Sequence, residues 1–295
     1  MIGINIPNSP QKFKNWLQTL GYSDASIYYL PKHIEEFFYF LKGFKTTEIN
    51  QSAIDSYFKY LAKRPNKRQD GGLSLSYMSK QKSALKLYFE FLRKQYKISY
   101  QFIYPHFDKI TTPPTVLTIE EVKLLFETCT DSILGKRNAV ILVLFYSCGL
   151  RKAEGLRLKV SDIDLVQRQI FIRKSKTHQQ RFVPMSKKSV LIIENYLYNA
   201  REFLIAPQTK EPRLLVGLKG RAISTDLLPK VLEKMIEKTK SKSIIQKSIT
   251  LHKLRHSIAT HLLANKMSLE DIAKFLGHKS LDSTQIYTHV AERHS

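Results

Sequence analysis

The sequence predicts a mainly α-helical protein with one small β-sheet, divided into two domains. Apolar residues recur at helical spacing over most of the 295 residues, and only two short segments alternate as strands do. A proline-rich stretch at 104–117 interrupts the helical pattern. These observations predict a helical N-terminal domain, a linker and a mixed α/β second domain.

Four helices are expected in the first hundred residues, because apolar side chains return there every three or four positions. The segments that show this pattern lie at 13–20, 27–41, 54–61 and 85–92. They predict a helical domain over residues 1–103. The basic loop at 63–72 is either a solvated connection or a phosphate contact, and the sequence leaves both readings open.

The second domain is expected to span residues 118–295, with the boundary near residue 112. Thr118 and Glu121 have the spacing of a capping box, in which each side chain satisfies a helix-end N–H group. The linker at 104–117 contains three prolines and has little periodicity. A helix should therefore begin directly after the linker.

The second domain should contain one hairpin among several helices. An apolar helix at 137–148 is followed by Gly149, a plausible C-cap. Segments 169–173 and 181–185 alternate and are joined by a basic turn, which predicts a hairpin. Further helical patterns lie at 187–204, 224–239, 251–265, 268–276 (with Ser268 as N-cap) and 281–290.

The charge of the chain predicts a polyanionic partner. The 48 Lys and Arg residues outnumber the 25 Asp and Glu residues, which gives a net charge of +23 and a pI near 9.8. The excess is +9 over residues 1–110 and +14 over residues 111–295, so both domains carry it. This distribution favours nucleic acid over a membrane surface.

The cysteines and the hydropathy pattern predict a cytoplasmic protein without a membrane span. Cys129 and Cys148 have no spacing typical of a disulfide framework. The longest apolar run, residues 139–146, is far shorter than a spanning helix, and the N-terminus has no targeting pattern.

The densest cluster of unusual side chains lies on one predicted helix. His252, Arg255 and His256 are three and four residues apart and share a face that suits an anion. Zinc is an alternative, but Lys253 replaces the glutamate of HExxH sites and Arg255 would repel the metal. Each histidine alone is also compatible with a structural role. Nucleotide-binding glycine loops do not occur, so a nucleotide cofactor is not expected.

Arg151 and Glu154 form a second pair of interest. They are three residues apart, so that the carboxylate could hold the guanidinium by its fork. Taken alone, this spacing is also that of an ordinary surface ion pair.

Five motifs together resemble the tyrosine recombinase (phage integrase) family, and in particular its Xer-like members. They occur in the order typical of that family, and Tyr287 follows His278 by nine residues. The resemblance covers nearly the whole chain and identifies the first domain as a core-binding domain and the second as a catalytic domain. The motifs are Gly149-Leu150-Arg151-Lys152-Ala153-Glu154, Lys176 before Arg181-Phe182-Val183-Pro184, His252-Lys253-Leu254-Arg255-His256, Leu276-Gly277-His278 and Tyr287-Thr288-His289.

The resemblance implies the role of three residues in phosphodiester cleavage. Arg151 and Arg255 would bind the non-bridging oxygens, where negative charge grows in the transition state. Tyr287 would attack phosphorus to form a 3′-phosphotyrosyl bond and release a 5′-hydroxyl, which later rejoins the strand. The covalent bond conserves the energy of the phosphodiester, so the resemblance implies neither metal nor cofactor.

The resemblance also implies the residues that move protons. Lys176 would protonate the leaving oxygen, although the turn lacks the glycines usual in relatives and Lys174 remains a rival. His252 would assist proton transfer, and His278 would hydrogen-bond the phosphate.

The implied function is that of a site-specific DNA recombinase. Its partners would be double-stranded DNA and three further subunits, in a homotetramer or with a related paired recombinase. A topoisomerase of type IB and a catalytically idle DNA-binding module are the alternatives. The sequence does not give the target site, because base readout depends on side-chain geometry in the grooves.

Overall fold

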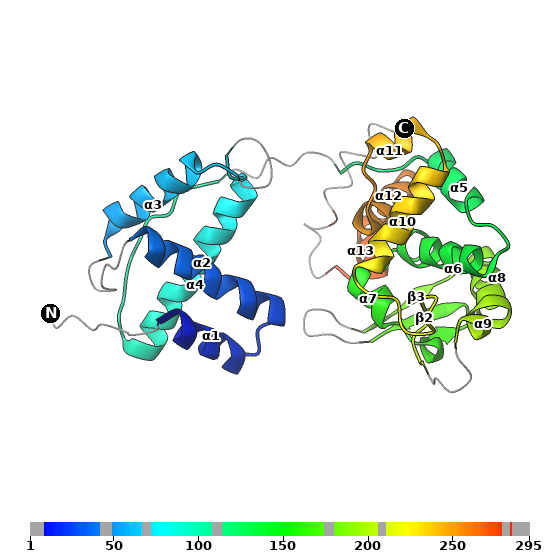
Figure 1. The fold of residues 1–295 in the computed structure, drawn as a ribbon, viewed down its shortest axis with the longest axis horizontal. Helices are drawn as coiled ribbons and strands as arrows, with labels where there is room; N and C mark the ends of the chain where they lie inside the picture. The colour runs from blue at the N-terminus through cyan, green and yellow to red at the C-terminus, as the bar shows by residue number, and fades with distance from the viewer. Residues whose placement is uncertain are drawn as a thin grey trace. The chain divides into compact units, whose positions relative to one another are not determined.

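The computed structural model divides the chain into two compact units, Met1–Thr111 and Thr112–Ser295. It describes residues 9–41, 49–66, 72–107, 114–173, 180–205, 211–278 and 284. Each unit has a hydrophobic core of its own. The described residues are mainly helical with one small sheet, which confirms the predicted fold class (Figure 1).

The first unit consists of four helices in its described part. They are α1 (Ser9–Thr19), α2 (Asp24–Phe40), α3 (Gln51–Lys63) and α4 (Leu75–Tyr96), which confirms the four predicted segments. Serine or asparagine side chains cap three of them, since Ser23, Asn50 and Ser74 each accept a hydrogen bond from the first turn. Aromatic rings fill much of the core, including Phe13, Phe37, Tyr57, Tyr88 and Phe91.

The segment that follows α4 packs against that helix. The ammonium groups of Lys82 and Lys86 lie over the rings of Phe107 and Tyr104, and Lys82 also donates a hydrogen bond to the Pro105 carbonyl. The predicted linker thus begins with residues that belong to the packing of this unit. The division into 1–103, 104–117 and 118–295 stays a prediction.

The second unit opens with the predicted capping box. Thr118 Oγ1 accepts from the Glu121 N–H, and a Glu121 carboxylate oxygen accepts from the Thr118 N–H, at the start of α5 (Ile119–Glu127). The apolar helix follows as α6 (Ile133–Leu142) and continues as a π-helical turn, η2 (Val143–Ser147). Gly149, with φ of 57°, comes directly after this turn.

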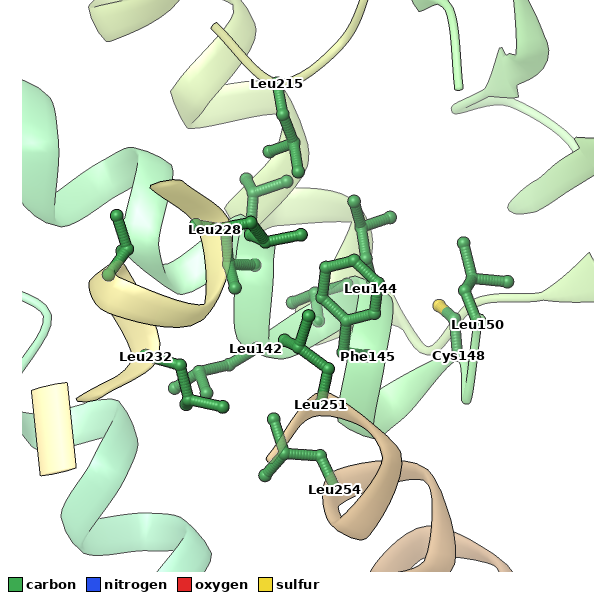
Figure 2. Packing of buried hydrophobic residues seen from close by; sticks show 14 of the residues in the cluster. Leu142, Leu144, Phe145, Cys148, Leu150, Leu215, Leu228, Leu232, Leu251 and Leu254 are labelled. Carbon is green, nitrogen blue, oxygen red and sulfur yellow. The ribbon is translucent and has the colours of Figure 1, made fainter. Parts of the chain in front are cut away.

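The core of the second unit surrounds this apolar helix (Figure 2). Phe145, Leu228 of α10 (Leu227–Lys238) and Leu251 of α12 (Leu251–Ala264) all belong to this core, and all three are at most 6% exposed. Each such side chain contributes about 1.5–3 kcal/mol when fully buried. This core therefore joins the apolar helix to α10 and α12.

The sheet has three antiparallel strands in the order β1-β2-β3. They are β1 (Ile163–Asp164), β2 (Gln169–Ile172) and β3 (Arg181–Pro184), and Ile170 pairs with both Ile163 and Val183. The predicted hairpin is confirmed, although residues 174–179 of its turn lie outside the described part. The sequence did not predict β1, because two residues are too few to show alternation.

The remaining helices follow the predicted segments with small differences. Segment 187–204 is one helical stretch interrupted by a π-helical turn, and three short helices, at 152–157, 160–162 and 242–246, were not predicted. The elements are α7 (Lys152–Arg157), η3 (Val160–Asp162), α8 (Lys187–Tyr196), η4 (Leu197–Arg201), α9 (Glu202–Leu204), α11 (Lys242–Gln246) and α13 (Leu269–Leu276). Ser268 caps α13 as predicted. Except for Thr284, the helix expected at 281–290 lies outside the described residues.

Two further predictions concern the membrane and the cysteines. Among the described residues, no helix is long and apolar enough to cross a bilayer. Cys129 and Cys148 are both free thiols, and burial raises the pKa of Cys129 to about 11 and that of Cys148 to about 12. Both side chains are therefore neutral at physiological pH.

Candidate active site

Arg151 stands at the start of α7, directly after a tight turn that closes the apolar helix. Gly149 takes a left-handed conformation in this turn, and a Cβ there would lie 2.9 Å from a methyl carbon of Leu276. The turn therefore needs glycine both for its φ angle and for its close approach to α13. It places Arg151 beside the C-terminal end of α13.

Arg255 reaches the same place from α12. Its side chain is only 1% exposed, and its two terminal nitrogens donate to backbone carbonyls of Gly149 and Leu276. Hydrogen bonds from a guanidinium to carbonyls leave its positive charge in place. The group is thus fixed in position as a cation.

A single carbonyl joins the two arginines. The oxygen of Leu276 accepts from Arg255 Nη2 at 2.6 Å and from Arg151 Nη1 at 3.3 Å. Arg151 Nη2 also donates to the Gly277 carbonyl at 2.9 Å. Two guanidinium groups from distant parts of the sequence therefore lie side by side, next to the residue that precedes His278.

Glu154 holds Arg151 in this position. Its carboxylate accepts from the Arg151 backbone N–H at 2.8 Å and from Arg151 Nη1 at 3.2 Å. The predicted pair is therefore present, but it is not a surface pair, since the two side chains are 24% and 10% exposed.

The fork expected for Arg151 belongs instead to Arg181. Both terminal nitrogens of Arg181 donate to Glu154, at 2.9 and 3.0 Å, and its Nε donates to the Phe275 carbonyl. A Cβ on Gly277 would lie 2.8 Å from this guanidinium, so the glycine allows Arg181 to pass. The sequence showed Arg181 only as a landmark of the strand, because its partners are remote along the chain.

The electrostatics of this network keep Glu154 ionised. Burial alone would raise the pKa of its carboxyl group, but the hydrogen bonds and charge of Arg181, followed by those of Arg151, lower it to about 2. One negative charge is thus shared by Arg181 and Arg151, while Arg255 lies beside them. The cluster keeps an excess of positive charge and suits an anion.

Two of the predicted histidines lie in the field of these arginines. Burial, then Arg255 and Arg151, lower the pKa of His278 to about 4, and the same causes lower the pKa of His252. His278 Nδ1 lies 2.9 Å from Thr284 Oγ1. Both imidazoles are therefore neutral at physiological pH and competent to donate one proton and accept another.

His256 is a further residue at this place, and the sequence singled it out only as part of the helix face. Its ring packs edge-to-face on that of His252, with 4.2 Å between the centroids. Burial, followed by His252 and Arg255, lowers its pKa to about 4. Within the described part of the chain, no group of three or more His, Cys, Asp or Glu side chains is arranged to hold a metal ion.

The structure brings Arg151, Arg255, His252 and His278 together but does not describe the other predicted site residues. Lys176 and its rival Lys174 lie in segment 174–179, and Tyr287 lies in segment 285–295; both segments are outside the described residues. The flanking elements are described, since β2 and β3 border the first segment and α13 precedes the second.

Comparison with known proteins decides the family. The model of the phage integrase family matches residues 115–294, which are the second unit almost in full. The chain belongs to the phage integrase family. It is a Xer-like tyrosine recombinase, since it is 31% identical over 284 residues to tyrosine recombinase XerD of Oceanobacillus iheyensis, covering 92% of this chain and 90% of that protein.

Solved structures of tyrosine recombinases share the fold. A XerH site-specific recombinase bound to a palindromic difH substrate in a post-cleavage complex aligns with a TM-score of 0.73 at 21% identity, covering 97% of this chain and 92% of that one. A lambda integrase tetramer bound to a Holliday junction aligns with a TM-score of 0.67 at 14% identity, covering 97% and 78%. Both comparisons extend over the two units of this tyrosine recombinase.

Proposed function

We propose that this protein cleaves and rejoins double-stranded DNA at a specific site through a 3′-phosphotyrosyl intermediate. One observation carries the proposal: Arg151 and Arg255, anchored on different elements, share the Leu276 carbonyl and form a fixed pair of cations. A phosphodiester in the transition state of cleavage spreads negative charge over two non-bridging oxygens. Two adjacent guanidinium groups match that charge.

In this proposal the arginines bind phosphate and the neutral histidines handle protons. In the proposed tautomer, Nδ1 of His278 accepts from the Thr284 hydroxyl, 2.9 Å away, so that the ring proton resides on Nε2 and is donated to a phosphate oxygen. His252, with its lowered pKa, accepts a proton from the attacking group. Glu154 takes no part in the chemistry and positions Arg151.

Tyr287 is the proposed nucleophile, and Lys176 is the proposed acid for the leaving 5′ oxygen. Attack by the Tyr287 oxygen forms the O–P bond while the bond from phosphorus to the 5′ oxygen breaks. The proton from Lys176 neutralises the departing oxygen. Attack by a 5′-hydroxyl on the phosphotyrosine reverses these steps, so that no external energy source enters the cycle.

Four subunits on two DNA duplexes form the proposed assembly, either as a homotetramer or with a related paired recombinase. The tetramer of the lambda integrase neighbour supports this reading. In the proposal residues 1–103 are the core-binding domain and residues 118–295 are the catalytic domain, both of which bind the duplex. The two free cysteines favour a cytoplasmic setting.

The experiment that tests the function uses DNA recovered in covalent complex with the wild-type protein. Supercoiled plasmids with two copies of the recovered site and nicked suicide duplexes are incubated with the full chain. Covalent adduct together with strand exchange is the expected result. Relaxation without exchange would indicate a topoisomerase of type IB, and neither product would indicate a DNA-binding module.

A second experiment separates Lys176 from Lys174. Lys176→Ala should slow cleavage of normal DNA but affect much less a duplex whose leaving 5′ oxygen is replaced by sulfur, which scarcely needs a proton to depart. Lys174→Ala should weaken DNA binding without selective rescue by sulfur. Rescue of Lys174→Ala alone would transfer the acid role to Lys174.

A further inference from the structure

A cavity of about 650 Å³ lies in the second unit, away from the four described residues of the candidate active site. Its walls come from the loop before α6, the first half of α6, the loop at 217–224 and one face of α10. This volume falls within the range of about 300–1,000 Å³ that is typical of small-molecule sites.

The face of α10 that lines the cavity combines an apolar row with a cationic row. Residues four apart on a helix lie on one face, and both rows have this spacing. The apolar row is Leu227, Val231 and Met235, and the cationic row is Lys230, Lys234 and Lys238. Lys219 and Arg221 add two more positive charges, and no Asp or Glu is among the described residues that line the cavity.

The cavity also has a buried cation with few partners. Arg137 is 5% exposed, and in the described part of the chain its guanidinium donates one hydrogen bond, from Nη2 to Asn138 Oδ1 at 3.1 Å. Its Nε has no partner and it forms no ion pair there. Burial accordingly lowers the pKa of Arg137. Buried charges in folded proteins are normally paired, so Arg137 is suited to pair with a bound anion.

Two apolar side chains that line the cavity are exposed to solvent. Leu218 is 72% exposed and Leu227 is 40% exposed, although both line the cavity. A ligand that carried only a charge would leave these leucines in water. A ligand with an apolar body would cover them and add hydrophobic free energy to the charge pairing.

We propose that this cavity binds a small amphiphilic anion, with a phosphate monoester or carboxylate at Arg137 and an apolar body along Leu218, Leu227 and Val231. The lysines of α10 and the 217–224 loop then surround the charged end. This activity is independent of the proposed strand cleavage, because the cavity shares no residue with Arg151, Arg255, His252 or His278.

The test measures displacement of the fluorescent probe anilinonaphthalene sulfonate from the full-length protein. Octyl phosphate and octanoate are the two amphiphilic competitors, and their relative strength distinguishes the phosphate from the carboxylate. Octanol lacks the charge and inorganic phosphate lacks the apolar body, so both should displace the probe poorly. A short duplex of arbitrary sequence is the competitor for the alternative that the cavity contacts DNA.

Variants assign the binding to this cavity. Arg137→Met keeps the length of the side chain and should weaken the better amphiphile about tenfold, the factor that one charge-assisted hydrogen bond commonly provides. Lys234→Glu should weaken it in the same direction. Lys188→Glu is the matched control, because Lys188 is exposed on α8 and lies outside the cavity, and it should bind as wild type does.

Four results would overturn the proposal. They are absence of saturable probe binding, displacement by inorganic phosphate as effective as by octyl phosphate, displacement by the duplex, and wild-type affinity in Lys234→Glu. Thermal unfolding of Arg137→Met is recorded in parallel. If that variant does not fold, the pair Lys234→Glu and Lys188→Glu decides the outcome alone.

Discussion

Each unit of this tyrosine recombinase contains a mostly buried glutamate that accepts hydrogen bonds from distant parts of the chain. In the first unit Glu36 of α2 pairs with Arg64 and accepts from Tyr77 at 2.6 Å and from Gln81 at 2.7 Å. In the second unit Glu154 accepts from Arg151 and Arg181.

The two networks differ in the other contacts that their arginines make. The Glu36 network ties α2, the end of α3 and α4 to one another, and it stabilises a scaffold. The arginines of the Glu154 network continue to the carbonyls of Phe275, Leu276 and Gly277, beside the buried Arg255. The same device therefore supports folding in one unit and orients an anion site in the other.

The largest expected effect comes from Glu154→Gln, which removes the charge that holds Arg151 and Arg181. A misplaced guanidinium stabilises the transition state poorly, so the single-turnover rate of covalent adduct formation should fall about 100-fold. DNA affinity should change little, because the cations remain. Glu194→Gln on the exposed face of α8 is the control. A wild-type rate in Glu154→Gln would show that Glu154 does not position the arginines of the site.

The corresponding change in the first unit, Glu36→Gln, should act on stability alone. Loss of a charged acceptor for three donors should lower the free energy of unfolding of this unit by about 2 kcal/mol. Hydrogen exchange at the amides of α2 and α4 measures this loss locally. The rate of adduct formation from bound DNA should equal that of wild type. A 100-fold slower rate would show that the Glu36 network, like the Glu154 network, also supports catalysis.

A smaller effect is expected for Arg181→Lys, which keeps the charge but loses the two parallel hydrogen bonds to Glu154. Lysine is a point charge and cannot replace the fork, so adduct formation should slow about tenfold. Arg157→Lys, exposed on α7, should have no effect. If the slowing appeared as weaker DNA binding instead, Arg181 would be a DNA contact rather than a positioning residue.

The smallest effect concerns the protonation of His278. Its pKa of about 4 lies below the ordinary 6.5 because of burial and the charges of Arg255 and Arg151. Stability from this site is therefore present above pH 6.5 and is lost as the pH falls towards 4. A bound DNA phosphate offsets the arginine charges and should raise the pKa, which NMR of the imidazole carbons can follow. An unchanged pKa in the DNA complex would place the phosphate elsewhere.

Much of the fold could be predicted because its signals are local. Helical periodicity predicted the four helices of the first unit. In the second unit, residue type and spacing predicted the N-terminal caps formed by Thr118 with Glu121 and by Ser268. Strand β1 was not predicted, because it is defined by its pairing with β2 rather than by a pattern of its own. The π-helical turn at Val143–Ser147 was not predicted either, because a continuous apolar run looks the same in an α-helix and in a π-helix.

The site could be predicted only as far as its motifs extend. Arg151, Arg255, His252 and His278 stand in short recognisable patterns, and the structure brings them together. The role of Arg181 depends on Glu154 and Phe275, which are far away in sequence. The sequence also did not show that Arg137 forms no ion pair with another described residue, because the pairing of a buried arginine depends on which carboxylates the fold brings near it.

The central claim is that the anion site of Arg151 and Arg255 serves a cleavage in which Tyr287 becomes bonded to DNA. The most direct measurement is covalent adduct formation on nicked suicide duplexes by wild type and Tyr287→Phe, with the modified peptide identified by mass spectrometry. The chain contains 15 tyrosines, so the peptide analysis distinguishes Tyr287 from 14 other candidate nucleophiles. We predict an adduct on Tyr287 in wild type and none in Tyr287→Phe, which should keep its DNA affinity. An adduct formed by Tyr287→Phe, or a wild-type adduct on another residue, would contradict the account.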